Sequence, residues 1–175
     1  MNPTFLKIFA LIEPTHIKCV IAGGAVVDFD QALDIDVFVL SQDWRTVLMV
    51  GNAIDGRRFT GSLMSLDDDI PYEGGHADDF YRLGSCHPSW SPKPIHITGF
   101  GGLSTGNSSV ESLLETFDLS VHAWAYDEKG RIHGIPTSTR PCDPITVSHI
   151  RSTTAARLLK LSQRYHPAGH PVEVH

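Results

Sequence analysis

The chain has few cysteines, no long apolar run and no secretory pattern at its N-terminus. It has three cysteines, an odd number, and Cys19, Cys86 and Cys142 show neither CxxC nor CxxH spacing. A disulfide framework or a zinc site is therefore not indicated, and a reducing cytoplasm is the expected compartment. Its longest apolar runs are far too short to span a bilayer, and its N-terminus lacks a basic region followed by a secretory core. We therefore expect neither secretion nor a membrane span.

Positive charge is also scarce. Fourteen Lys and Arg stand against twenty Asp and Glu, which gives a formal net charge of −6. Bulk electrostatics therefore do not favour a nucleic-acid backbone as a partner, and no bulk nucleic-acid binding is expected. A polyanion would have to meet a local basic patch or a bound cation.

The composition is that of an ordinary globular protein, with 175 residues, of which 41% are hydrophobic and 19% charged. We expect a single domain over residues 1–165. Residues 67–94 are rich in Asp, Gly, Pro, Ser and His and are predicted to be an irregular insertion, with one short element at 80–83. Residues 166–175 are expected to be a flexible C-terminal tail.

Hydrophobic periodicity predicts a chain of alternating helices and strands. In the first part it favours a helix over 3–12, a buried strand over 17–21 that runs into a glycine turn, and a strand over 34–40. Ser41 is predicted to cap a helix over 42–54 that Gly56 stops, and residues 57–66 favour another strand. The expected fold class is α/β (α+β), with a short mixed β-sheet flanked by helices.

The second part continues the pattern. It predicts a strand over 95–100, a glycine-rich loop over 101–107, and a short helix capped by Ser108 or Ser109. Residues 128–130 are typical of a hairpin turn. A last helix is predicted over 148–164, with Ile150, Leu158 and Leu161 facing inward; its basic residues, Arg157, Lys160 and Arg164, are interpreted as a solvated face.

The informative constellation is Gly23-Gly24 followed, after nine residues, by Asp34-Ile35-Asp36. In a strand, side chains at i and i+2 point to the same face, so Asp34 and Asp36 can bind the same divalent cations. A Gly-Gly turn lets backbone amides approach a triphosphate without side-chain obstruction. Together these features can hold a metal-bound nucleotide.

With this spacing the sequence resembles the DNA polymerase beta-like nucleotidyltransferase superfamily, whose signature is Gly-Gly or Gly-Ser followed by an Asp-x-Asp strand. The likeness is greatest to the head domain of bacterial poly(A) polymerases and tRNA CCA-adding enzymes. Residues 23–28, Gly-Gly-Ala-Val-Val-Asp, look like their Gly-Gly-x-Val-Arg-Asp segment. Residues 117–127 are similar to their Arg-Asp-Phe-Thr-x-Asn-Ala-x-Ala-Tyr-Asp block. A small, stand-alone member, such as those found in phages, is the nearest analogy.

The resemblance implies specific roles. Asp34 and Asp36 would be metal ligands for Mg²⁺ or Mn²⁺, and Gly23 and Gly24 would contact the triphosphate of a nucleoside triphosphate, the substrate. Asp118 would lie near the ribose or supply a third metal ligand. The implied reaction moves a nucleoside monophosphate to an acceptor hydroxyl on an RNA end, a protein or a small molecule.

The chain departs from the family at several positions. Val27 replaces an arginine, Thr116-Phe117 replaces an Arg-Arg or Arg before the later aspartate, and His122 stands where the family has asparagine. The strand that normally carries the third metal carboxylate contains no acid here.

Three sources of a third ligand stay open. Asp118 can serve if residues 117–121 form a strand beside 34–40, whereas residues 67–69, three acids, are also typical of a solvated turn. His96 can be a neutral ligand or a structural group.

A rival interpretation is a catalytically silent protein of this fold that binds a nucleotide or a protein partner through the same cleft. The acid-free strand around His96 and the missing arginines favour it. A Rossmann site is excluded because Gly23-Gly24 lacks the third glycine of GxGxxG, and no glycine loop ends as a P-loop does. Cys86 next to His87 is interpreted as incidental, not as a nucleophile and its base.

Overall fold

The computed structural model describes residues 1–41, 43–56, 80–101, 108–148, 150, 154–165 and 173–174. Its helices are α1 (Pro3–Ile12), α2 (Gly24–Val27), α3 (Trp44–Asp55), α4 (Val110–Glu115) and α5 (Thr154–Tyr165), with 3-10 helices η1 (Glu13–Thr15) and η3 (Ser120–His122). Its strands are β1 (Cys19–Ala22), β2 (Ile35–Val39), β3 (Phe80–Cys86), β4 (Ile95–Phe100), β5 (Trp124–Asp127), β6 (Ile132–Gly134), β7 (Thr146–Val147) and β8 (Glu173–Val174).

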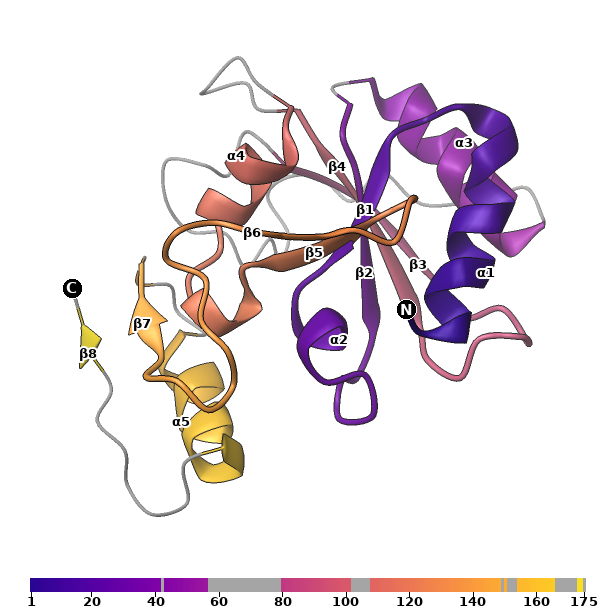
Figure 1. Ribbon diagram of the computed structural model, residues 1–175. Coiled ribbons are helices and arrows are strands. Elements are labelled where there is room, and N and C mark those ends of the chain that lie inside the picture. The colour runs from indigo at the N-terminus through magenta and orange to yellow at the C-terminus, as the bar shows by residue number, and fades with distance from the viewer. Residues whose placement is uncertain are drawn as a thin grey trace.

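Within the described residues, six strands form one mixed sheet in the order β3-β4-β2-β1-β5-β6. The pair β2–β4 is parallel and the other neighbours are antiparallel. The sheet is seen nearly edge-on in Figure 1, with helices on both sides. This mixed sheet with flanking helices confirms the expected fold class.

One face of the sheet is covered by α1 and α3 (Figure 1). The N-terminal helix forms as predicted, because its apolar residues at spacings of three and four face the sheet and Asn2 caps its first turn by accepting from the Thr4 amide at 2.8 Å. Its inward residues Phe5, Ile8, Phe9 and Ile12 are all buried. They pack with Ile35, Val37 and Val39 of β2 in the main core.

The other face of the sheet packs against α4, through a second core that includes Phe38, Phe100 and Leu113. Ile35 and Val37 belong to the first core and Phe38 to the second, so the predicted alternation along β2 is confirmed. Asp36 shares the parity of Phe38. The strand therefore directs its aspartates away from the α1–α3 core.

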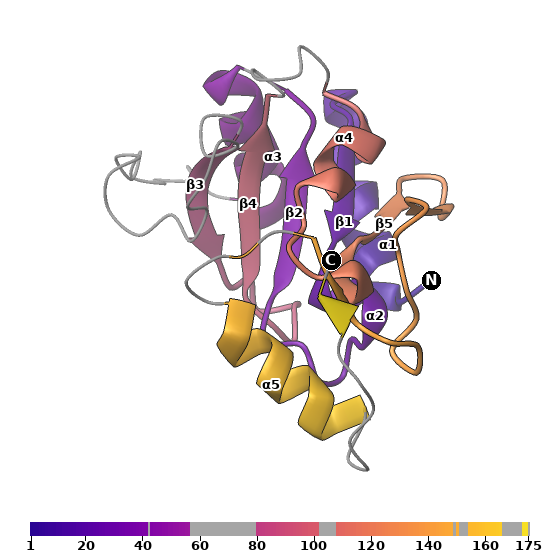
Figure 2. The same ribbon diagram turned by 90° about the vertical axis from the view of Figure 1, so that its left-hand side faces the viewer.

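A third, smaller core joins α5 to the rest of the chain. Leu161 of α5 packs against Leu119, Val121, Ile145 and Val147. Figure 2 shows α5 crossing the end of the sheet at which β2 begins. None of the helices in the described parts of the chain is both long and apolar enough to cross a membrane.

Several sequence expectations need correction. Asp43, not Ser41, caps α3, because the Ser41 hydroxyl accepts from the Asp43 amide and the helix begins only at Trp44. Gly56 ends it as predicted, at φ +66°. Ile150 is 81% exposed rather than inward, since it precedes the first turn of α5.

The insertion and the tail also differ from expectation. The short element predicted at 80–83 extends over Phe80–Cys86 and forms the edge strand of the sheet. In the expected flexible tail, Glu173–Val174 pairs in parallel with Thr146–Val147. The predicted strand 57–66 and most of the predicted loop 101–107 lie outside the described residues.

Candidate functional site

The glycine turn after β1 lies directly beside β2. In the antiparallel register Ala22 is opposite Asp36, so the chain leaves β1 at the level of that aspartate. Gly23 has φ +83°, a conformation that side chains disfavour, and a Cβ there would lie 3.4 Å from Asp36 Oδ2. Glycine is therefore needed both for the turn and to leave the Asp36 carboxylate uncovered.

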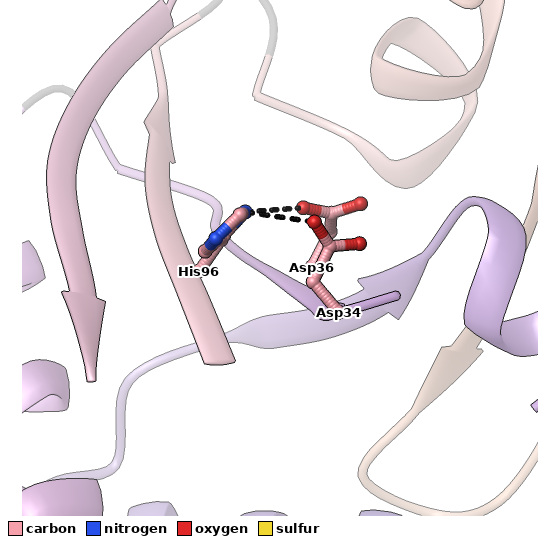
Figure 3. Close-up of side chains that lie close together, drawn as sticks. All are labelled: Asp34, Asp36 and His96. Carbon is pink, nitrogen blue, oxygen red and sulfur yellow. Dashed lines mark ion pairs between the residues drawn. The ribbon is translucent and has the colours of Figure 1, made fainter. Parts of the chain in front are cut away.

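Three side chains from two parallel strands meet at the beginning of β2. Asp36 is opposite His96 in the β2–β4 register. His96 Nδ1 lies 3.3 Å from Asp34 Oδ2 and 3.6 Å from Asp36 Oδ1. Figure 3 shows the imidazole pointing at both carboxylates. His96 is thus brought into the candidate site, although the sequence left open whether it was a ligand or a structural group.

These three side chains fit a divalent cation. One ligand atom from each of Asp34, Asp36 and His96 lies within 4.8 Å of the other two. Donors that share one ion at about 2.1 Å are separated by roughly 3.0–3.4 Å in octahedral or tetrahedral coordination. The 3.3 Å and 3.6 Å distances from His96 to the two carboxylates therefore need only small adjustments. The side chains are 22–39% exposed, which gives solvent and a ligand access to the remaining coordination positions.

The two aspartates of the cluster line a cavity of about 350 Å³. Its wall combines the glycine turn, the loop before β2, the two aspartates and one side of α5. The lining residues that carry polar chemistry are Gly23, Gly24, Gln31, Asp34, Asp36, Asp118, His122, Arg157, Lys160, Arg164 and Tyr165. The residues predicted for the site from sequence therefore line one cavity.

The cavity wall formed by α5 is basic. Arg157, Lys160 and Arg164 all line the cavity, although the sequence favoured a solvated helix face for them. Their spacing of three and four residues was the available signal, but it does not indicate what the stripe faces. The structure places these cations in the lining of the cavity that also contains the two aspartates.

Asp118 lies in the cavity wall but outside the carboxylate–histidine cluster. It is 1% exposed, accepts from Thr154 Oγ1 at 2.7 Å and pairs with Arg157 Nη1 at 3.1 Å. The hypothesis that residues 117–121 form a strand beside β2 is wrong, because β2 is flanked by β1 and β4 and Ser120–His122 is a 3-10 helix. The described contacts of Asp118 therefore attach α5 to the body of the protein.

His122 lies next to the glycine turn, where its Nε2 is 4.0 Å from the position of a Cβ on Gly24. Burial and the Arg157 guanidinium lower the pKa of His122 to about 4, against the opposing effect of Asp118 and Asp36. The imidazole is therefore uncharged near neutral pH. A neutral imidazole can both donate and accept a hydrogen bond, as the amide of asparagine can.

The loop that leads into β2 is attached at two points. Lys93 Nζ donates to the carbonyls of Asp30, at 3.3 Å, and Ala32. The Tyr165 hydroxyl at the end of α5 donates to Asp28 Oδ2 at 2.9 Å. These contacts hold the floor of the cavity and the C-terminal end of α5 in a fixed relation to Asp34.

Cys19 and Cys86 are not activated as nucleophiles. Burial raises the pKa of the Cys19 thiol to about 12 and that of the Cys86 thiol to about 11. Both stay protonated near neutral pH, which agrees with the interpretation that Cys86 is not a nucleophile. The alternative third acids, residues 67–69, lie outside the described residues.

Neither protein-family models nor curated proteins match this chain. Solved structures do: a Thermotoga maritima CCA-adding enzyme in complex with tRNA has a TM-score of 0.59 at 17% identity. CCA-adding enzymes in complex with CTP and with ATP have TM-scores of 0.57 and 0.56, at 17% and 18% identity. These three matches cover 99–100% of this chain but only 40–41% of the enzymes. The fold is thus the nucleotidyltransferase fold, here about two fifths the length of those enzymes.

Proposed function

We propose that the protein is a metal-dependent nucleotidyltransferase that moves a nucleoside monophosphate from a nucleoside triphosphate to an acceptor hydroxyl. One observation carries this proposal: Asp34 and Asp36, which cluster with His96, line the same cavity as the Gly23-Gly24 turn and the cations of α5. The cavity therefore combines carboxylates that can bind a cation with basic side chains that can bind an anion. A metal-bound triphosphate needs both.

The triphosphate would lie between the glycine turn and α5. Gly23 leaves the backbone open to close approach, and Lys160 and Arg164 of α5 supply positive charge to the same cavity. Gly24 would contact the triphosphate beside it. Asp118, which lines the cavity, would lie near the ribose. Its carboxylate also accepts a hydrogen bond from Arg157.

Asp34, Asp36 and His96 are the residues that would hold a divalent cation. A bound Mg²⁺ or Mn²⁺ would supply neutralisation of the developing phosphate charge and a lower pKa for the acceptor hydroxyl. The acceptor oxygen would form the new bond to the α-phosphorus, and the bond to the β-phosphate oxygen would break. Pyrophosphate leaves with that electron pair, and the acceptor proton passes to solvent. The neutral His122 beside Gly24 is suited to donate or accept a hydrogen bond there.

The acceptor is proposed only as a hydroxyl-bearing end of RNA, a protein side chain or a small molecule. The solved structures with this fold include complexes with tRNA, CTP and ATP, which supports an RNA end as the first acceptor to try. The net charge of −6 supports contact with a short end rather than a long nucleic-acid surface.

A second candidate is a catalytically silent protein that binds a nucleotide, or a protein partner, in the same cavity. His96 favours it, because the imidazole, and not a carboxylate, is the β4 side chain opposite Asp36, and in the family that the sequence resembles a later strand carries the third carboxylate. A neutral ligand there lowers the negative charge available to hold two divalent cations.

One experiment separates these candidates. The protein is incubated with each α-³²P-labelled ribonucleoside triphosphate, Mg²⁺ or Mn²⁺, and total cellular RNA, and both retained and covalently transferred label are measured. The enzyme proposal predicts transfer to RNA or to the protein that the double substitution Asp34→Asn/Asp36→Asn abolishes. Retention without transfer favours the silent binder. Transfer that survives the double substitution, or neither transfer nor retention, contradicts the enzyme proposal.

A further inference from the structure

The metal cluster of this chain has a mixed donor set. Asp34 and Asp36 supply carboxylate oxygens, and His96 supplies an imidazole nitrogen from the neighbouring parallel strand. Mg²⁺ prefers oxygen donors and binds through one or two carboxylates together with waters and phosphates. Imidazole instead suits transition-metal cations such as Co²⁺, Ni²⁺ and Zn²⁺. The imidazole of His96 therefore affects which cation the site prefers.

The position of His96 is fixed by the sheet, not by a loop. It lies within β4, between the buried residues Ile95 and Ile97, and it pairs in register with Asp36. Its Nδ1 is within 3.3 Å and 3.6 Å of one oxygen from each aspartate. An ion bound at the carboxylates would meet this nitrogen without rearrangement of the backbone, which makes the imidazole a ligand instead of a distant neighbour.

The negative charge of the cluster fits a single divalent cation. The two carboxylates carry a formal charge of −2, which one divalent cation neutralises. We propose that Asp34, Asp36 and His96 form a site for a single resident transition-metal cation of the Co²⁺ or Zn²⁺ class, and that His96 sets its preference over Mg²⁺. This inference rests on the proposed function, because it specifies the ion at that same site.

The test uses tag-free protein and three metals alone: Co²⁺, Zn²⁺ and Mg²⁺. Titration calorimetry measures each affinity, and the visible absorption of Co²⁺ reports a change in its ligands. Transition-metal cations bind most nitrogen and oxygen sites tightly, so the wild-type affinity by itself does not decide the matter. The deciding quantity is the ratio of Co²⁺ to Mg²⁺ affinity in wild type and in His96→Glu.

The proposal predicts one equivalent of Co²⁺ per chain and a fall in the Co²⁺/Mg²⁺ affinity ratio of about tenfold or more in His96→Glu, with an altered Co²⁺ spectrum. The matched control is His87→Glu, the same substitution at an exposed histidine just beyond β3. It is expected to leave both the ratio and the spectrum unchanged. His96→Gln, which removes the imidazole without adding charge, is a second variant in case His96→Glu does not fold.

An unchanged ratio and spectrum in a folded His96 variant would overturn the proposal, as would the absence of stoichiometric Co²⁺ binding to wild type. Tighter Co²⁺ binding in His96→Gln, which removes the imidazole without adding a carboxylate, would also overturn it, because His96 would then block the aspartates. These outcomes are separate from the proposed function. Mg²⁺-dependent triphosphate binding with no role for His96 would leave that function standing, and selective Co²⁺ binding without nucleotide binding would reject only the function.

Discussion

Arg157 Nη1 lies 3.1 Å from Oδ1 of Asp118, a carboxylate that is 1% exposed. The two residues are 39 positions apart in the sequence and join α5 to the segment that follows α4. Thr154 donates to the other carboxylate oxygen from the first turn of the same helix. This contact places the basic side of α5 over the cavity.

Arg157→Ala should therefore destabilise the protein. The substitution leaves a buried carboxylate with one fewer donor, which costs roughly 1–3 kcal/mol of unfolding free energy. Urea denaturation monitored by circular dichroism measures this loss. Lys160→Ala, three residues along on an exposed position of the same helix, is the matched control and should change stability by less than about 0.5 kcal/mol. Equal effects of the two substitutions would contradict a structural role for the Arg157–Asp118 pair.

Gly23→Ala should weaken metal–triphosphate binding, whereas the control Gly56→Ala should not. Gly56 lies in the left-handed helical region, at φ +66° and ψ 11°, where alanine costs about 1–2 kcal/mol of unfolding free energy. Gly23, at φ +83° and ψ −152°, lies in a region that is essentially confined to glycine, so alanine should cost more there. At Gly23 the new Cβ would contact Asp36 Oδ2 and Phe117, whereas at Gly56 nothing lies within 4 Å. Denaturation and metal–triphosphate titration of both variants are compared. Gly56→Ala should keep full binding, and Gly23→Ala with wild-type binding would contradict the assigned role of the turn.

His122 should make stability depend on pH. Because its pKa in the folded state is lowered to about 4 from an ordinary value near 6.5, the unfolded chain binds the proton more tightly. The contribution is complete above about pH 6.5 and is lost as pH falls toward 4, at a slope on the order of 1 kcal/mol per pH unit. Denaturation of wild type and His122→Asn between pH 7 and about 4 measures it. His122→Asn should flatten the profile, and the exposed-site control His87→Asn should not; identical profiles for His122→Asn and wild type would refute the assignment.

Local patterns predicted much of the fold. Helix α1 and strand β4 occupy the predicted residues, because their apolar periodicity is regular and Asn2 or Pro94 marks their beginning. The Asp34–Asp36 face of β2 followed from strand alternation alone. The cap of α3 was misassigned to Ser41, since Ser41 and Asp43 are both good caps and the choice depends on where the helix begins.

The site required contacts that no local pattern encodes. His96 joins the aspartates because β4 pairs with β2 in one particular register, and a single sequence does not specify that register. The basic stripe of α5 reaches the cavity through the Asp118–Arg157 and Asp28–Tyr165 contacts, which span 39 and 137 positions. The same long-range pairing places Asp118 in contact with Thr154 and Arg157 of α5 and outside the Asp34–Asp36–His96 group.

Thermal melting tests the metal–nucleotide site most directly. Wild type and Asp34→Asn/Asp36→Asn are melted with each ribonucleoside triphosphate, in the presence of Mg²⁺, Mn²⁺ or a chelator. A triphosphate at one hundred times its dissociation constant should stabilise the fold by about 2.7 kcal/mol, or raise Tm by about 5–10 °C. We predict such a shift for at least one triphosphate, dependent on metal and absent in the double variant. A shift that persists in the double variant or in chelator, or no shift with any triphosphate, would contradict the metal–nucleotide site.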